Sequence, residues 1–588
     1  MTPADPRLGP ILVIFQGGNE AEGLVALDRF LAHHPDHAEA LALAGFCRLR
    51  RGEAGEALGF LDRAVVADPG SWLARMNRAG ARRALADYAG AAEDYLAAAR
   101  GNPQAEFWIE AAAMYAALAR RDEARRALEE ALHLVAEHPV ALNNLGLILE
   151  ESDPREARAL FLRAAEADPG NAEIAGNLER MLVEEGLHIG KGQGASAARP
   201  FWEQALRRWP DMAGLWTGLG NHLLELGEIV GAEEAFARAV ALKPERAEAR
   251  INLGIVLHRQ DRPEAALLLY AEAAALEEGP SSSSALRWNR ALSLLALGRL
   301  EEGFADYETR DYLDAYRRLP FPRWDGRPFP GKTLLLHAEQ GYGDAIQFAR
   351  YAALAKERGG PGAQVLLACD PPLERLLARV RGVAGIVPAS ALAAARCDWE
   401  APLLSLPHLF NTRLETIPAA VPYIDLEGER TERRPGEPSR IGLVARGNPK
   451  YGNDRRRSIP SEALAALPRA APAGVRWVGF HHGGNRPRGT EGWLEEGLTG
   501  VADFYDTALR LREMDLVIAV DTATAHLAGA LGVPVWVLLP FAPDWRWLRG
   551  RSDSPWYPTA RLFRQPRDGA WEEVVAEVAQ VLADRFRE

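Results

Sequence analysis

The stretch LLLHAEQGYGDAIQFARYAALAKERGG, residues 334–360, contains the pattern that indicates the fold of the second half of the chain. It begins with a short apolar run typical of a strand, breaks at Gly341-Tyr342-Gly343, and continues with the spacing of an amphipathic helix. A glycine-bounded turn between a strand and a helix is where α/β proteins place phosphates and catalytic carboxylates. Asp344 lies at that turn, so it could be a catalytic acid or base, part of a phosphate site, or a helix cap.

Further strand–helix units follow this stretch. The apolar runs TLLLHA, QVLLAC, GIVP and DWEAPL predict the strands of one α/β unit, and RIGLVA, VRWVGF, LVIAV and PVWVLL predict those of a second. The polar segment DLEGERTERRPGEPS links the two, and AWEEVVAEVAQVLADRF is predicted as a closing helix. Alternating strands and helices favour parallel sheets. We therefore expect two Rossmann-like domains, at residues 316–430 and 431–588.

The first half of the chain repeats at a nearly constant period. Its prolines are spaced by 34, 34, 36, 30, 41, 34 and 36 residues, at Pro35, Pro69, Pro103, Pro139, Pro169, Pro210, Pro244 and Pro280. One unit adds the wider pattern Trp216, Leu219, Gly220, Ala232, Phe236, Ala239 and Pro244. This pattern resembles the tetratricopeptide repeat, in which small residues let paired helices approach and proline ends the second helix. Residues 1–315 are therefore predicted to form a solenoid that binds an acceptor protein.

The longest of these spacings contains a glycine-rich insertion, GLHIGKGQGASAARP, at residues 186–200. Glycine-rich segments of this kind could cradle a phosphate, but the insertion lacks the GxxxxGK[ST] spacing of a phosphate loop. We interpret it as an interrupted repeat with a flexible loop.

Composition excludes several classes of protein. Among 588 residues, 48% are hydrophobic and 26% charged, as in a globular chain of several domains. A net charge of −12 argues against a dedicated nucleic-acid binder. No apolar run reaches the length of a membrane helix, and the first residues lack a cationic start, so we expect a cytoplasmic protein. Cys47, Cys369 and Cys397 have no metal-binding spacing.

Two motifs narrow the fold of the second half. GYGDAIQFARY and DLVIAVDTATAHLAGALGVPVWVLL resemble the heptosyltransferase-related glycosyltransferases, and LLPFAPDWRWLRGRSDSPWYPTARLFRQP resembles their repeat-coupled branch. The whole architecture resembles the bacterial TPR-containing flagellin glycosyltransferases. That resemblance implies a GT-B fold and an inverting enzyme that transfers a nonulosonic acid such as pseudaminic acid. The donor would be a nucleotide sugar, CMP-linked, with no other cofactor, and the acceptor a Ser or Thr of flagellin.

The motif VDTATAHLAGALG predicts the donor side of such a site. A strand ends just before Asp521, and a helix begins within a few residues, so Asp521 or Thr522 could cap that helix. The free amides of this turn, which includes Thr524, would form an anion site with the helix dipole. His526 could add a hydrogen bond or a charge to the leaving phosphate, or could be an ordinary helix histidine.

The loop ARGNPKYGNDRRRS follows the first strand of the same unit and is strongly cationic. Its candidate donor-binding residues are Arg446, Asn448, Lys450, Asn453, Arg455 and Arg456. Cationic groups at this place would neutralise phosphate charge as the glycosidic bond breaks, although such a run could also be a solvated face. The chain has no DxD triad, so we expect a donor site without a metal.

On the acceptor side, the resemblance implies that Asp344 removes the proton of the acceptor hydroxyl. Gln347 and Arg350 follow about one helical turn later and could share its face, and His337 and Glu339 are weaker candidates. Aligning the repeats places one asparagine at the same point of five first helices, at Asn77, Asn144, Asn177, Asn252 and Asn289. In the O-GlcNAc transferases, whose repeats these resemble, such a ladder holds a peptide backbone. The alternative is a set of solvated amides.

Two other functions fit the same pattern. One is an enzyme that glycosylates a glycan or lipopolysaccharide, with the repeats as a scaffold. The other is a repeat adaptor whose transferase half is degenerate, because a fold alone does not establish activity.

Overall fold

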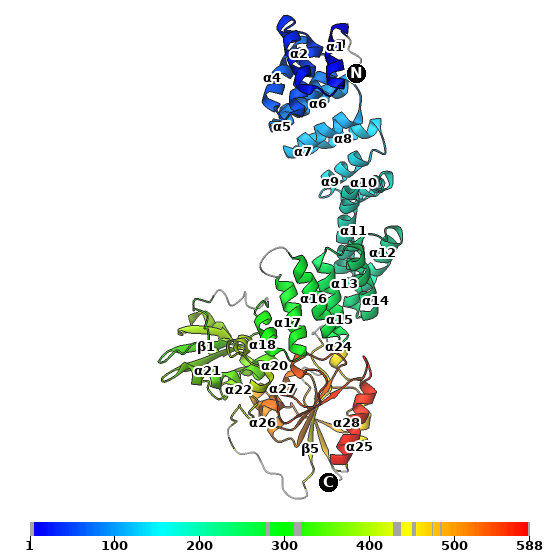
Figure 1. Cartoon of the computed structure of the whole chain (residues 1–588). Coiled ribbons are helices and arrows are strands. Elements are labelled where there is room, and N and C mark those ends of the chain that lie inside the picture. Colours follow the sequence, from blue (N-terminus) through cyan, green and yellow to red (C-terminus); the bar gives the residue numbers. More distant parts are fainter. Residues whose placement is uncertain are drawn as a thin grey trace. The chain divides into compact units, whose positions relative to one another are not determined.

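The computed structural model describes residues 5–277, 283–310, 319–426, 428, 437–449, 454–472, 474–481 and 485–585. Helices form the N-terminal part of the chain, and two sheets with surrounding helices form the C-terminal part (Figure 1). The chain divides into two compact units, Met1–Gly218 and Leu219–Glu588. Among the described residues, none of the helices combines the length and the apolar character needed to cross a membrane.

The first unit consists of consecutive paired helices. They are α1 (Gly9–Gln16), α2 (Glu20–His33), α3 (Ala38–Arg50), α4 (Ala54–Ala67), α5 (Trp72–Ala84), α6 (Tyr88–Gly101), α7 (Ala105–Ala117), α8 (Arg121–Leu134), α9 (Pro139–Leu149), α10 (Pro154–Ala167), α11 (Ala172–Gln193), α12 (Ala195–Arg208) and the start of α13 (Ala213–Leu226). In each repeat the first helix, here the A helix, packs on the second, the B helix, as α9 does on α10. The predicted helical solenoid is confirmed.

The helix pairs approach closely because their contact positions are small. A Cβ at Gly146 of α9 would lie 3.0 Å from the Phe161 ring of α10, and one at Gly45 of α3 would lie 2.4 Å from Leu61 of α4. Polar residues begin the helices, as Ser71 does by accepting the N–H of Ala74 at 3.2 Å. The small contact residues are those predicted from the repeat pattern, whereas the caps were not predicted.

The expected flexible loop at residues 186–200 is wrong. Helix α11 continues to Gln193, and α12 starts at Ala195 after a single residue, Gly194, with φ of +88°. The first glycine of this insertion makes room for Trp202, because a Cβ at Gly186 would lie 2.3 Å from its indole. Gly218 meets the other side of the same ring at 2.4 Å. The insertion therefore lengthens one helix and buries a tryptophan.

The second unit begins with further helices and continues into a four-stranded parallel sheet of order β3-β2-β1-β4. The helices are the rest of α13, α14 (Ile229–Leu242), α15 (Ala247–Arg259), α16 (Pro263–Leu276), α17 (Ser284–Ala296) and α18 (Leu300–Tyr307). The strands are β1 (Thr333–His337), β2 (Gln364–Cys369), β3 (Gly385–Pro388) and β4 (Trp399–Pro402), with helices α20 (Tyr342–Phe348), α21 (Tyr351–Gly359), α22 (Pro371–Leu377) and α23 (Leu406–Leu409).

A second parallel sheet has six strands in the order β10-β9-β8-β5-β6-β7. They are β5 (Arg440–Val444), β6 (Arg476–Gly479), β7 (Leu494–Glu496), β8 (Leu516–Val520), β9 (Val535–Leu539) and β10 (Ala560–Arg564). Its helices are α24 (Asp454–Arg457), α25 (Ala466–Ala470), α26 (Phe504–Arg512), α27 (Ala523–Ala530) and α28 (Trp571–Arg585). All eight predicted strands are present, and both α/β regions are confirmed.

One hydrophobic core joins the last repeat helices to the sheets. Phe304 and Tyr307 of α18 pack against Trp545, with ring centroids 5.6 and 6.0 Å apart, and Phe304 also meets Phe348 of α20. Arg549 forms ion pairs with Asp261 at 2.7 Å and with Glu264 at the start of α16. The boundary between the two compact units falls within α13, whereas the domain boundary predicted from the sequence is at residues 315/316.

Candidate functional site

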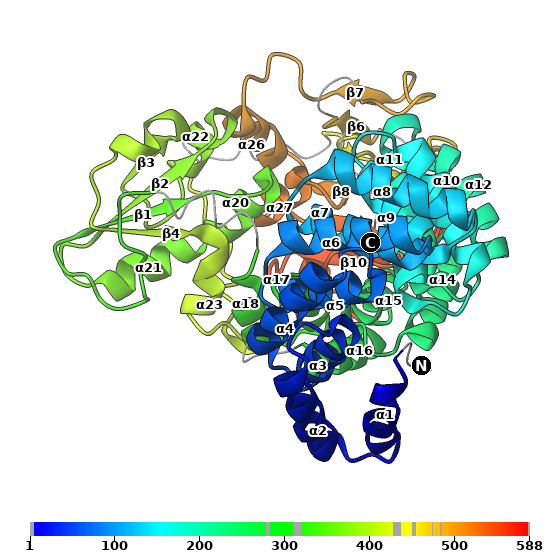
Figure 2. The ribbon, with the colours of Figure 1, turned by 90° about the horizontal axis from the view of Figure 1, so that it is seen from above.

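The starts of α20 and α27, which follow the GYGD and VDTATAH turns predicted as parts of a site, lie side by side within the second unit. Helices α20 and α27 are in contact, and both views of the ribbon show them adjacent (Figures 1 and 2). Gly343 of α20 faces His526 of α27 so closely that a Cβ would lie 2.9 Å from the imidazole Cδ2. Glycine is therefore required at this point of the GYGD turn, and the structure brings Asp344 and His526 into one neighbourhood.

Both carboxylate oxygens of Asp344 accept hydrogen bonds. Oδ2 accepts the backbone N–H of Gly341 at 3.0 Å, which satisfies a free amide at the start of α20. Oδ1 accepts from Nη2 of Arg546 at 2.5 Å. Burial raises the pKa of Asp344, and the Arg546 guanidinium opposes that effect. Asp344 thus has a capping role, from inside the first turn, and an ion pair as well.

Arg546 connects carboxylates from the two α/β regions. It lies in a short 3-10 turn, Trp545–Trp547, and its Nη1 donates to Asp544 at 2.8 Å while Nη2 donates to Asp344. The guanidinium lies over the Trp545 ring at 4.2 Å and is largely buried. Although burial opposes it, the two carboxylates raise the pKa of Arg546 well above its ordinary value. Sequence analysis missed Arg546 and Asp544, whose signal was the alternation of charge and tryptophan in PDWRW.

His526 is held as a neutral ring. Its Nδ1 lies 3.0 Å from the Tyr557 hydroxyl, its Nε2 lies 3.8 Å from Asp521, and the imidazole stacks on Trp547 at 5.1 Å. Burial, together with the nearby Arg546, lowers the pKa of His526 to about 3. Of the two roles predicted for His526, the lowered pKa favours a hydrogen bond over a positive charge near neutral pH.

The start of α27 has no side-chain cap. Thr522 occupies the N-cap position, but its hydroxyl donates back to the Val520 carbonyl at 3.2 Å, and Asp521 does not cap either. The expected capping role of both residues is wrong. Thr524 is buried in the first turn. An uncapped helix start carries the positive end of the helix dipole and N–H groups suited to an anion.

The carboxyl of Asp521 should make the protein less stable as pH rises. Burial and the neighbouring Asp544 raise the pKa of Asp521 from 3.8 to about 6. Because the folded state holds this proton more tightly than the unfolded chain, its contribution is present below pH 4 and is lost between about pH 4 and pH 6. We expect Asp521→Asn to unfold like the wild type at pH 4 but to be more stable at pH 7, by at most about 3 kcal/mol.

Urea unfolding at pH 4, 5, 6 and 7 measures this difference. Asp544→Asn is the control with opposite sign, because the Arg546 guanidinium, although burial opposes it, holds the pKa of Asp544 below its ordinary value. That variant should lose stability at pH 7 relative to the wild type. A pH-independent difference between Asp521→Asn and the wild type would show that Asp521 titrates normally.

The cationic loop reaches this neighbourhood through one arginine. Arg457 donates to the Asp521 carbonyl at 3.1 Å and to Asp454 at 3.1 Å. Arg446 instead donates to the Ser461 hydroxyl at 2.9 Å, which holds the loop on its own unit.

The two arginines that precede Arg457 have other surroundings. Arg456 lies 3.8 Å from Asp568, and Arg455 is exposed. Asn448 lies in the described part of the loop, whereas Lys450 and Asn453 lie outside the described residues. The loop residue that contacts the Asp521 turn is thus Arg457, the last of the three consecutive arginines.

The five repeat asparagines share one helix position but not one environment. Each is the sixth residue of its helix, in α5, α9, α11, α15 and α17. Asn177 donates to Asn143 at 3.0 Å, and Asn143 donates to Asn144 at 3.2 Å, so three amides form a chain across α9 and α11. Asn143 was not predicted.

The remaining ladder positions differ from this pair. Asn77 in the first unit is buried, and Asn252 in the second unit is half-buried. Asn289 donates to the Ala285 carbonyl of its own helix at 2.8 Å. The amides most open to a ligand in the first unit are therefore those of α9 and α11.

The remaining acceptor-side candidates are interior residues. Gln347 is fully buried, which is incompatible with direct contact to a protein acceptor. Arg350 is also buried and donates to the Trp556 carbonyl at 2.5 Å. His337 lies 2.6 Å from Glu400, and Glu339 pairs with Arg310 at 2.6 Å. These residues hold the α/β region together.

Comparisons with known proteins agree with the helical part. The tetratricopeptide repeat family model matches residues 15–71, 109–172, 187–245 and 219–283. The crystal structure of MamA aligns with a TM-score of 0.26 and 22% identity, over 27% of this chain and 95% of MamA. The C-terminal part of a TPR repeat-containing protein from Cytophaga hutchinsonii aligns with a TM-score of 0.36 and 14% identity, over 42% of this chain and 99% of that one.

Two curated proteins are similar in sequence. Tetratricopeptide repeat protein 8 of Caenorhabditis elegans is 34% identical over 59 residues, which are 10% of this chain and 12% of that protein. Protein FlbA of Caulobacter vibrioides is 31% identical over 503 residues, which are 78% of this chain and 81% of FlbA. That alignment is too long to lie within either half alone. The chain is a tetratricopeptide repeat protein and belongs to the family of FlbA.

Proposed function

We propose that this protein is a glycosyltransferase that moves a sugar from a nucleotide donor to a hydroxyl group of a protein bound by its repeats. The observation that carries the proposal is that Gly343, next to Asp344, packs against α27, whose start is uncapped, so that two sheet-end turns of different α/β regions meet. A carboxylate that can accept a proton and a helix start that can bind a phosphate are the two parts that sugar transfer needs.

The proposed reaction uses these groups in one displacement. The acceptor oxygen attacks the anomeric carbon, the bond from that carbon to the phosphate oxygen breaks, and the phosphate leaves with the electron pair. Asp344 takes the proton of the acceptor hydroxyl. In this proposal the amides of α27 and the guanidinium of Arg457, which donates to the Asp521 carbonyl, would neutralise the departing phosphate. Attack from the face opposite the phosphate would invert the anomeric centre.

The substrates are proposed from the sequence resemblance. It favours a CMP-linked nonulosonic acid as donor and flagellin as acceptor, with no metal and no further cofactor. Tetratricopeptide repeats offer a peptide-binding face on their A helices. In this chain the amides of Asn144 and Asn177 belong to that face and could bind a peptide backbone.

A nucleotide panel tests the proposal. The cognate nucleotide among CMP, UDP, GDP and ADP should raise the melting temperature of the full chain, because a ligand that binds only the folded state stabilises it. Arg457→Ala should weaken that nucleotide about 10- to 100-fold, as expected for the loss of a hydrogen bond to a charged group. Isothermal titration measures the affinity.

Arg455→Ala is the matched control, since Arg455 is exposed on the same helix, α24. It should leave affinity unchanged. If none of the four nucleotides stabilises the protein, the donor proposal fails. If one does but both variants bind it like the wild type, the loop is not part of the pocket.

A further inference from the structure

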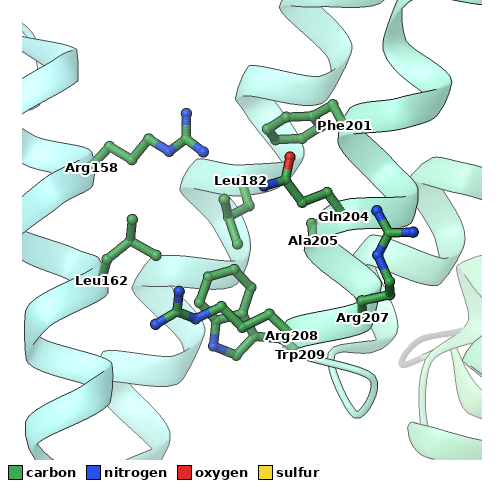
Figure 3. A pocket seen from close by; sticks show the side chains of 9 residues that line it. All are labelled: Arg158, Leu162, Leu182, Phe201, Gln204, Ala205, Arg207, Arg208 and Trp209. Carbon is green, nitrogen blue, oxygen red and sulfur yellow. The ribbon is translucent and has the colours of Figure 1, made fainter.

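A hollow of about 330 Å³ lies in the first compact unit, among α10, α11, α12 and the turn after α12 (Figure 3). Its apolar lining includes Leu162 of α10, Leu182 of α11, and Phe201 and Trp209 at the two ends of the α12 wall. Figure 3 shows Leu162 facing this wall from α10, with Leu182 between them. The volume falls within the range of small ligand sites and is enough to enclose one large apolar side chain.

Three arginines complete the lining, and two of them are held in place by glutamates outside it. Arg158 donates one N–H to Glu185 at 2.6 Å, and Arg208 donates one N–H to Glu166. A guanidinium carries five N–H groups, so each of these single bonds orients the arginine and leaves other donors for a ligand. Figure 3 shows both guanidinium groups beside the hollow.

The third arginine strengthens the positive charge of this place. Arg207 is exposed and forms no ion pair among the described residues. None of the side chains that line the hollow is a carboxylate, although the chain as a whole has a net charge of −12. The guanidinium of Arg158 also lies over the Phe201 ring at 5.8 Å, and that of Arg208 over Trp209 at 5.1 Å. The apolar side chains of the hollow thus lie beside three positively charged arginines.

The hollow is not lined by any of the ladder asparagines Asn77, Asn144, Asn177, Asn252 and Asn289, which we call the asparagine row. Its walls are mainly the B helices α10 and α12, with Leu182 from the A helix α11, and neither Asn144 nor Asn177 lines it. A ligand here therefore need not compete with a peptide held by the row.

We propose that this hollow docks an acidic segment of a partner protein that carries one leucine or aromatic side chain. The apolar side chain enters among Leu162, Leu182 and Phe201, and the flanking carboxylates accept from Arg207 and Arg208. Carboxylates and guanidinium groups form paired, charge-assisted hydrogen bonds, which gives the site its preference for acidic partners. The proposal is independent of sugar transfer.

A library of random 12-residue peptides displayed on phage, selected on the full chain, tests the proposal. We expect the enriched peptides to combine Asp or Glu with Leu, Phe or Trp. The most enriched one, labelled with fluorescein, should bind at least tenfold more weakly to Arg207→Glu by fluorescence anisotropy. Its affinity should also fall as salt is raised. Within the part of the chain that the structure describes, Arg207 has no ion pair to lose, so circular dichroism should show an unchanged fold.

Two controls locate the binding. Arg126→Glu makes the same change at an exposed arginine of a B helix, α8, outside the hollow, and Asn144→Ala alters the asparagine row. Both should leave peptide affinity unchanged. Enrichment of neutral or basic peptides would overturn the proposal, as would loss of binding in Asn144→Ala with none in Arg207→Glu. Self-association that Arg207→Glu abolishes would identify a second copy of the chain as the occupant and equally refute an acidic partner.

Discussion

Asp344→Asn should leave a folded protein that still binds nucleotide but transfers sugar about 10²–10⁴ times more slowly. Asparagine matches aspartate in size, and its amide oxygen can still accept the N–H of Gly341, so the start of α20 keeps its cap. It cannot accept the proton of an acceptor hydroxyl. The loss should therefore fall on kcat, whereas the donor KM stays close to the wild-type value.

The ion pair with Arg546 requires a control, because the variant also removes one of its two carboxylates. Asp544→Asn removes the other one, which pairs with the same guanidinium at 2.8 Å, and leaves Asp344 intact. If Asp344 acts as a base, only Asp344→Asn should lose transfer. If Asp344 serves only to hold Arg546, the two variants should lose similar amounts of activity.

A third possible result would change the role assigned to Asp344. Transfer at the wild-type rate in Asp344→Asn would make the residue a cap and an ion-pair partner only. Both of its oxygens are already engaged in the structure, which is the observation that favours such a structural role. The base would then have to be sought elsewhere, and Asp521, whose pKa burial raises to about 6, is one acidic alternative.

The second large effect concerns which C-terminal fragments of the chain can fold. A fragment of residues 316–588 should fail to fold, although it holds both sheets. It lacks α17 and α18. Phe304 and Tyr307 of α18 are fully buried and pack against Trp545. Burying one large apolar side chain stabilises a protein by about 1.5–3 kcal/mol, and a whole domain is stable by only about 5–15 kcal/mol. Losing several such contacts, with the ion pairs of Arg549, exceeds what the fragment can sustain.

A fragment of residues 212–588 is the matched comparison. It begins just before α13 and keeps all repeat helices that share the core of the sheets. Circular dichroism and thermal melting should show a cooperative transition for this fragment and none for residues 316–588. A cooperative transition in the shorter fragment would show that the two α/β regions are independent of the repeats.

The sequence predicts the regular parts of this fold well because their signals are local. Eight apolar runs became strands, since a strand buried on both faces needs a continuous apolar segment. The two missed strands have other patterns. Strand β7 is three residues long and mostly exposed, and β10 alternates arginine with apolar residues. The insertion at residues 186–200 was misjudged because its first glycine, Gly186, accommodates Trp202, a contact that composition does not reveal.

The candidate site could be predicted only in part. Asp344 and His526 follow strand ends, and strand ends of α/β units are where sites form, so each turn was found from its own motif. Arg546 was not, because its partner Asp344 lies 202 residues away in the chain. The low pKa of His526 and the full burial of Gln347 both result from tertiary packing, which the local sequence does not show.

The shared core of α17, α18 and the sheets has a consequence for how this protein can diverge. None of the residues of that shared core lies in Met1–Gly218, so a whole repeat of about 34 residues can be gained or lost there without altering the core beneath Asp344. The repeats after Gly218 have no such freedom. Homologues should therefore differ in repeat number at the N-terminal end, and the length of the array becomes a variable that evolution can adjust to the size of the partner.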